Sequence, residues 1–445
     1  MTKPISRLLP ASALASIPSD LSPYWSKRCH KLQPALWCPT ESDCHSLVGS
    51  SGLIKQVGSP APAEDLVPPF VSPVLEGERP KEKEVSRKIR LYPANESKWE
   101  ECLWAARRAY NFAIEAFKEW KKDVPSEADN QVAFRRSIRE KVAAEFPDVP
   151  RVMLDEAVNS AYLTRKAIIS RRSKGEQCDF SFRRRRDSKQ SFVVERLANG
   201  GPFPTFLKCH LTEAIPSEAA GKMANVVREN GRWFLTCKVK VPVAAESQGR
   251  AAVACDPGVR TFLATYSISD CAFIGHGFAA KVRLMLLQLD KLLGRRKCLT
   301  NIKDWKQGHR DRFCNLQKRI NSIFNKVRDL TNDLHRRAAD FLTKNYDVIL
   351  LPTFETSEMV SKGSRKINSR VVRSMLSLGH YRFKQFLIWM AYKRGKTVVE
   401  CGEAWTSCTD SRNGIVVDLG SKEWINKLHR DVNGPRGIFL RALAA

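Results

Sequence analysis

Long apolar runs are missing from this chain of 445 residues. No stretch approaches the roughly 20 apolar residues that a membrane-spanning helix needs, so we expect no membrane partner. Residues 1–30 also lack the long apolar segment of a secretory signal peptide, which argues against secretion. The 13 cysteines are scattered without a paired framework, which fits a reducing compartment better than a disulfide-stabilised fold.

Acidic residues are scarce relative to basic ones. The chain has 75 lysines and arginines against 47 aspartates and glutamates, which gives a formal net charge of +28. Such an excess attracts polyanions, and nucleic acid is the commonest polyanion that proteins bind. We therefore expect a nucleic-acid-binding protein with roughly two or three domains.

Sustained periodicity is absent from residues 1–85. This stretch is rich in proline and serine, as in Val67-Pro-Pro-Phe-Val-Ser-Pro73. Composition of this kind predicts a mostly disordered extension over 1–85.

Helical and strand patterns follow from about residue 87. Apolar residues at helical spacing predict amphipathic helices that form a small bundle, over about 95–122, 131–146 and 152–172. Strand patterns predict a small antiparallel barrel that the helices interrupt, from segments 87–92, 192–195, 224–228 and 233–241.

A basic segment, Arg183-Arg-Arg-Arg-Asp-Ser-Lys189, lies between phenylalanines. Basic residues beside aromatics suit phosphate contacts with some base stacking, although an isolated run can also be a solvated loop. The nearby basic residues and the net charge favour binding. The predicted nucleic-acid-binding residues here are Arg171, Arg172, Lys174, Arg183, Arg184, Arg185, Arg186 and Lys189.

From about residue 250 the pattern changes to an α/β order. We expect a strand hairpin over 252–274, then long helices, and afterwards strands that alternate with helices. The first strand stops at Asp256-Pro257-Gly258, where proline and glycine turn the chain. Asp256 is therefore expected at a strand end, where it could bind a metal ion; the alternative is an aspartate that only caps the turn.

The motif Cys255-Asp-Pro-Gly-Val-Arg-Thr-Phe262 resembles the first RuvC-type motif of the TnpB nucleases and of Fanzor, their eukaryotic counterpart. The resemblance covers about residues 86–445, and the Pro-Thr-Phe variant favours Fanzor. Further stretches are similar in the same order: Arg87-Lys-Ile-Arg-Leu-Tyr-Pro93 with Arg108-Ala-Tyr-Asn111, Val348-Ile-Leu-Leu-Pro-Thr-Phe354 with Met359-Val360, and His429-Arg-Asp-Val-Asn-Gly434 with Arg436-Gly-Ile438.

The resemblance implies an α+β multidomain fold. It comprises a split β-barrel wedge domain over 86–96 and 180–245, and an inserted helical recognition lobe over 97–179. An RNase H-like (RuvC) α/β nuclease domain would follow over 250–445. It would contain a helical insertion at 280–345 and a degenerate zinc-knuckle remnant at 404–428.

The resemblance also implies catalysis with Mg²⁺ in a two-metal site. Carboxylates at strand ends would bind two ions roughly 3.5–4 Å apart. Asp256 is the first acid and Asp431 the last, although an aspartate at this position can also be a helix N-cap. Pro352 replaces the middle acid of TnpB.

Fanzor proteins place the middle acid after the next strand instead. In this chain that position is Glu403, before Thr406-Ser407. We prefer Glu403, with Glu355 second and Glu400 third. Arg260, inside the first motif, is expected to contact nucleic acid.

The zinc knuckle of the family lacks its cysteines here. Asp410 and Asn413 stand where the first cysteine pair belongs, so we expect no zinc. Either packing of Trp405, Val417 and Trp424 holds the loop, or this copy is losing its function.

The expected function is that of an RNA-guided, transposon-associated DNA endonuclease. Its partners would be a guide RNA and double-stranded target DNA, in a monomeric ribonucleoprotein in the nucleus. The alternatives are a catalytically impaired RNA- and DNA-binding descendant, and an RNase H-fold enzyme without a guide, such as a resolvase or transposase.

Overall fold

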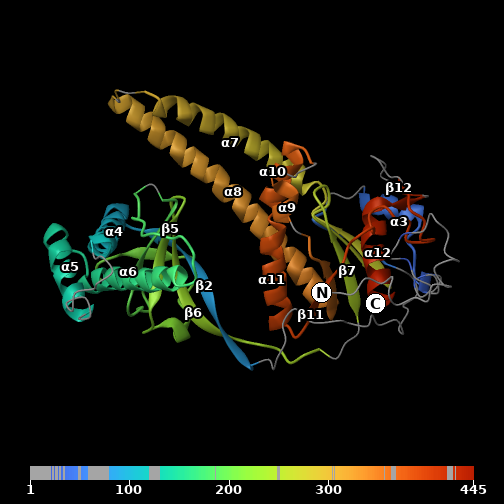
Figure 1. Cartoon of the computed structure of the whole chain (residues 1–445), viewed down its shortest axis with the longest axis horizontal. Helices are drawn as coiled ribbons and strands as arrows, with labels where there is room; N and C mark the ends of the chain where they lie inside the picture. The colour runs from blue at the N-terminus through green and yellow to red at the C-terminus, as the bar shows by residue number, and fades with distance from the viewer. Residues whose placement is uncertain are drawn as a thin grey trace. The chain divides into compact units, whose positions relative to one another are not determined.

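The structure is a computed structural model. It describes positions 22, 25, 29, 32 and 33 and residues 36–48, 52–58, 80–119, 131–185, 187–247, 251–302, 304, 306–354, 356–361, 367–417, 424–425 and 427–444. The chain divides into two compact units, one of Met1–Lys81 with Pro242–Ala445 and one of Glu82–Val241. We call them the outer-sequence unit and the inner-sequence unit and describe each by itself (Figure 1).

A six-stranded sheet forms the centre of the outer-sequence unit. Its order is β1 (Ile54–Gly58), β9 (Asp270–Ile274), β8 (Leu263–Ser267), β7 (Ala252–Pro257), β10 (Val348–Pro352) and β11 (Thr397–Cys401). Strands β7, β8 and β9 form an antiparallel meander, whereas β10 lies parallel to both β7 and β11. The hairpin predicted at 252–274 is therefore confirmed, and the later strands join its other edge.

Successive residues of β7 point to opposite faces of this sheet, and each face is covered. Ala252 and Ala254 lie in a core with Phe439 of α12 (Arg430–Ala444). Val253 and Cys255 lie in another core with Leu342 of the long helix α8 (Gln307–Asn345). A strand buried on both faces reads as a continuous apolar run, which explains the sequence Val-Ile-Leu-Leu-Pro of β10.

The other helices follow the predicted amphipathic patterns. Helix α7 (Phe278–Thr300) runs beside α8 (Gln307–Asn345), and Leu289, Leu292 and Ile320 are buried between them (Figure 1). Short helix α9 (Thr356–Val360) leads to α10 (Ser369–Leu378) and α11 (His380–Lys393), and Trp424–Ile425 (β12) pairs with Leu428–His429 (β13) before α12. Among the helices of the described ranges, none is both long and apolar enough to cross a bilayer.

The prediction of a disordered extension over 1–85 is wrong for the described residues of that range. Strand β1 pairs antiparallel with β9 and thereby extends the sheet. Helix α3 (Glu41–Val48) buries Cys44 and Leu47 in the same core as Phe439. These elements could not be predicted from the sequence, because their apolar residues occur in short segments. Each segment is stable only when it packs against strands and helices that are distant in sequence.

The inner-sequence unit combines strands and helices on one core. Its five-stranded sheet has the order β3 (Lys189–Val194), β5 (Ala224–Glu229), β6 (Arg232–Pro242), β2 (Glu82–Pro93) and β4 (Cys209–Leu211). Its helices are α4 (Glu96–Glu119), α5 (Gln131–Glu145) and α6 (Arg151–Arg172). Trp99 of α4, Phe192 of β3 and Trp233 of β6 lie in the same hydrophobic core.

A tight turn joins β5 and β6. Asn230 and Gly231 both have positive φ, 48° and 74°. This is the backbone that a two-residue hairpin of matching twist requires, and it is why Asn-Gly occurs there. The wedge and recognition-lobe boundaries remain predictions.

Candidate active site

Asp256 lies at the end of β7, opposite Ala264 of β8. Pro257 and Gly258 follow, and the Gly258 amide donates to the carbonyl of Phe262 at 3.2 Å. A Cβ at position 258 would lie 2.7 Å from the Thr261 carbonyl oxygen, so the turn requires glycine. The sequence placed Asp256 correctly at a strand end beside a tight turn.

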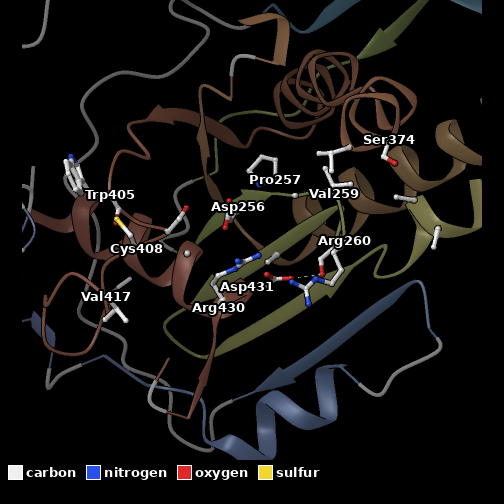
Figure 2. Close-up of a pocket in the computed structure, with 18 of the residues that line it drawn as sticks. Asp256, Pro257, Val259, Arg260, Ser374, Trp405, Cys408, Val417, Arg430 and Asp431 are labelled. Atoms are coloured by element: carbon white, nitrogen blue, oxygen red, sulfur yellow. Dashed lines mark hydrogen bonds between the residues drawn. The ribbon is translucent and has the colours of Figure 1, made fainter. Parts of the chain in front are cut away.

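Asp431 enters the site from the first turn of α12. Thr261 Oγ1 donates to Asp431 Oδ2 at 3.0 Å, and Thr261 Oγ1 also lies 3.0 Å from His276 Nδ1 (dashed line at Asp431 in Figure 2). Because Thr261 is buried, it fixes the orientation of the Asp431 carboxylate. Thr261 is a site residue that the sequence analysis missed, although it stands inside the first motif.

Gly434 allows α12 to approach Asp256. A Cβ at position 434 would lie 2.3 Å from Asp256 Oδ2, closer than any side chain could be placed. The helix that carries Asp431 therefore packs directly against the carboxylate of Asp256. The glycine of the third motif is explained by this contact.

Burial and neighbouring carboxylates change the acidity of Asp256. Its pKa is raised to about 7, first by burial, then by the negative charges of Asp431 and Glu403, while Arg430 lowers it. Burial also raises the pKa of Glu403, which follows β11. Glu403 thus acts electrostatically on Asp256 from the position that the Fanzor resemblance implied.

The predicted convergence of three carboxylates to a metal-bridging distance is not present. Asp256 and Asp431 line one cavity of about 1040 Å³, but Glu403 is not among its described lining residues (Figure 2). Within the described ranges, no three His, Cys, Asp or Glu residues are grouped closely enough to hold a metal ion. The Asp431 carboxylate is directed to Thr261 by a hydrogen bond.

The other two candidates for the middle acid are not equivalent. Glu355 lies outside the described residues. Glu400 forms an ion pair with Lys384, with Oε1 2.7 Å from Nζ. Lys384 therefore compensates the charge of Glu400. Glu403 is the described glutamate whose charge raises the pKa of Asp256.

Comparison with known proteins gives related sequences. The sequence matches no protein-family model. It is 22% identical to TnpB-like protein L770 of Acanthamoeba polyphaga mimivirus over 76% of this chain and 68% of that protein. It is 29% identical to the putative transposase R186 of the same virus over 42% of this chain and 39% of that protein. The chain is thus similar in sequence to TnpB-like proteins over most of its length.

A solved structure, "Cryo-EM structure of the Cas12f1-sgRNA-target DNA complex", also matches. The match covers 81% of this chain and 99% of that chain, with 10% sequence identity and a TM-score of 0.39. So low a TM-score supports no conclusion about the fold. The likeness to the TnpB-like proteins therefore rests on sequence.

Buried side chains of α12 hold the loop before β12. Asn433 Nδ2 donates to the Thr409 carbonyl at 2.7 Å, and Asn433 Oδ1 accepts from the Ser411 amide at 2.8 Å. Arg436 Nη1 donates to the Ser411 carbonyl at 2.7 Å. Packing of Trp405 does not hold the loop, because its side chain is exposed.

Asp410 and Arg436 complete this arrangement. Asp410, at a predicted cysteine position, is fully buried and pairs with Arg412, with Oδ2 3.0 Å from Nη2. Arg436 Nε also donates to the carbonyl of Trp37 at 3.3 Å. Hydrogen bonds to backbone thus link α12, the loop and the N-terminal segment.

The predicted nucleic-acid-binding residues separate into two groups. Arg183 is partly buried; it donates to Ser160 Oγ at 2.8 Å and its guanidinium lies 3.7 Å from the centre of the Tyr110 ring. Arg183 therefore supports the protein core, and its contact with nucleic acid remains a prediction. Arg186 lies outside the described residues. The exposed members are Arg171, Arg172, Lys174, Arg184, Arg185 and Lys189, and Arg260 is exposed at the cavity.

Proposed function

We propose that the chain is an RNA-guided DNA endonuclease with an RNase H-like (RuvC) site, from a transposon-associated lineage. The observation that carries the proposal is the pairing of Asp256, at the end of the central strand β7, with Asp431, at the start of α12. They line one cavity and couple electrostatically. The sheet order β9-β8-β7-β10-β11 and the TnpB-like relatives support it.

The donor set fits magnesium. Asp256, Asp431 and Glu403 provide hard carboxylate oxygens, and burial together with the charges of the other two acids raises the pKa of Asp256. These three residues would hold Mg²⁺, which when bound activates water and stabilises the leaving oxygen of a phosphodiester. Within the described residues no three-ligand group is preformed, so Glu403 would have to move toward the aspartates for this role.

Other residues of the cavity have roles that need no metal. Thr261 orients the Asp431 carboxylate through its hydrogen bond. Arg260 and Arg430 line the same cavity and supply positive charge for a phosphate group. Gly434 allows the strand end and the helix end to meet.

The guide and target would bind largely through positive charge. The exposed arginines and lysines after α6 and before β3 suit phosphate contacts without base selectivity, so recognition of sequence would fall to the guide RNA. We propose a monomeric ribonucleoprotein that acts on double-stranded DNA in the nucleus. The wedge and recognition-lobe roles of the inner-sequence unit belong to the same proposal.

A second candidate is a descendant that binds RNA and DNA but does not cut. Two observations favour it: the three acids do not form a closed group, and Asp410 occupies a cysteine position in the loop. The first candidate requires cleavage with Mg²⁺, and the second excludes it.

The test is expression of the protein beside its native flanking DNA, followed by sequencing of the RNA that purifies with it and a cleavage assay. We expect bound RNA and Mg²⁺-dependent cutting. D256A and D431A should each reduce cutting by at least about 1000-fold, E403A somewhat less, and all should retain the RNA. The matched control E400Q, three residues before Glu403 in sequence, should cut almost normally.

Each failure has a defined meaning. Protein that is free of RNA after this expression contradicts the guided mechanism and favours a guide-free enzyme of RNase H type. Protein that carries RNA but leaves DNA intact in Mg²⁺ supports the binding descendant. If E403A cuts normally while E355A does not, the middle acid is Glu355.

A further inference from the structure

Trp405 combines exposure with an unusual backbone. Its side chain is 51% exposed, whereas tryptophans such as Trp25, Trp99 and Trp233 are almost fully buried. Its φ is +68°, in the left-handed region that residues other than glycine rarely adopt. An observed strained and exposed aromatic residue points to a functional role, because neither property stabilises the fold.

The turn around Trp405 is rigidly hydrogen-bonded. The Trp405 carbonyl accepts from the amides of Cys408 at 3.2 Å and Thr409 at 3.1 Å. Asn433 of α12 donates to the carbonyls on either side of this turn, Thr406 at 3.4 Å and Thr409 at 2.7 Å. Because α12 also carries Asp431, the backbone at Trp405 is anchored to the helix that carries that carboxylate.

The surroundings of the indole are cationic. Trp405 lines the same cavity as Asp256 and Asp431, together with Arg260, Arg283 and Arg430. In Figure 2 the two aspartates lie between Trp405 on one side and Arg260 on the other. An aromatic platform beside a basic groove is the combination that binds single-stranded nucleic acid, through base stacking and phosphate contacts.

We propose that Trp405 stacks against an unpaired base of the DNA strand that enters this cavity. The stacked base fixes the register of the strand, and therefore which phosphate reaches Asp256 and Asp431. This inference rests on the proposed function for the nature of the substrate. Trp405 would position the DNA strand, and it lies outside the motifs that contain Asp256 and Asp431.

The test measures binding in chelator, so that it does not depend on cleavage. The purified ribonucleoprotein is titrated with a labelled oligothymidine and with an oligonucleotide of equal length whose central residues are abasic. The abasic strand keeps the phosphates and loses the bases. We expect W405A to bind the thymidine strand about 5- to 100-fold more weakly and W405F to bind it nearly normally. Both variants should bind the abasic strand as the parent does.

F324A is the matched control. Phe324 is another exposed aromatic residue, 43% exposed on α8, and it is not among the described lining residues of the cavity. F324A should bind both strands normally. Trp405 is exposed, so W405A should unfold at the same temperature as the parent.

The possible outcomes separate the proposals. Equal affinity of W405A and the parent for thymidine strands overturns the stacking, as does an equal loss for abasic strands. A W405A protein that binds DNA normally but loses a protein partner also overturns it. If W405A binds the thymidine strand more weakly but the parent never cuts DNA in Mg²⁺, Trp405 still stacks on a base, and the proposed nuclease activity is wrong. Where the parent cuts, W405A should spread the cleavage over neighbouring phosphates.

Discussion

The carboxylate site and the loop beside it line the same cavity but are built differently. Asp256 and Asp431 are positioned by main-chain elements, the end of β7 and the start of α12. Residues 406–411 are positioned by side chains, since Asn433 and Arg436 donate to their carbonyls. A strand end is specified by a short motif, whereas the loop depends on buried polar groups that each need a partner. The loop should therefore be more sensitive to single polar substitutions.

Removal of the Arg436 guanidinium should have the largest effect on stability. R436M leaves the carbonyls of Ser411 and Trp37 without this donor in a buried site. We expect a loss of about 3 kcal/mol in the free energy of unfolding. Hydrogen exchange of the full chain should show faster exchange of residues 36–48 and 406–411, while β7 stays protected.

R436K is the control, because it keeps the charge but reaches fewer acceptors. It should recover part of the protection. Equal protection in R436M and the parent would mean that packing, and not this hydrogen-bond network, holds the loop.

A methyl group added at Gly434 tests whether the close packing of α12 against β7 positions the carboxylates. In G434A the added Cβ would meet Asp256 Oδ2, so α12 must shift. We expect a loss of about 2 kcal/mol in unfolding free energy and a decrease of about 100-fold in cleavage rate. Urea unfolding and the Mg²⁺-dependent assay measure the two effects.

G294A is the matched control for that substitution. A Cβ at Gly294, within α7, would meet no atom within 4 Å. Alanine there should stabilise the protein by about 0.5–1 kcal/mol. If G434A raises the free energy of unfolding as G294A does, α12 does not approach Asp256 as closely as described.

The pH dependence of D256N gives the smallest expected effect. The pKa of Asp256 is about 7 when folded and about 3.8 when unfolded, so the folded protein binds more protons between these pH values. Its stability therefore falls as pH rises through this window. Asparagine does not titrate, so in chelator D256N should gain about 2 kcal/mol over the parent at pH 8 and less at pH 5.

Adding Mg²⁺ should reverse this order at pH 8, because bound metal stabilises the folded parent and D256N lacks a ligand. Thermal unfolding with and without Mg²⁺ measures both effects. A difference that does not change between pH 5 and pH 8 would contradict the raised pKa of Asp256 in the folded protein.

The features that could be predicted from the sequence are those that depend on local main-chain signals. Asp256 and the α7–α8 pair were predictable, because a Pro-Gly turn and helical periodicity are local signals. The burial of Arg183 and the position of Glu403 outside the cavity lining were not, because both depend on contacts between distant segments. Arg436 and Trp37 are separated by 399 positions, and no short pattern reports such a contact.

The pairing of β1 with β9 has a consequence for the order of folding. β1 is synthesised more than 200 residues before β9, and α3 waits still longer for α12. The inner-sequence unit is continuous in the chain and can condense as soon as it has left the ribosome. Until β9 and α12 have been synthesised, β1 and α3 lack the partners they pack against, and their docking then requires slow closure of a very long loop.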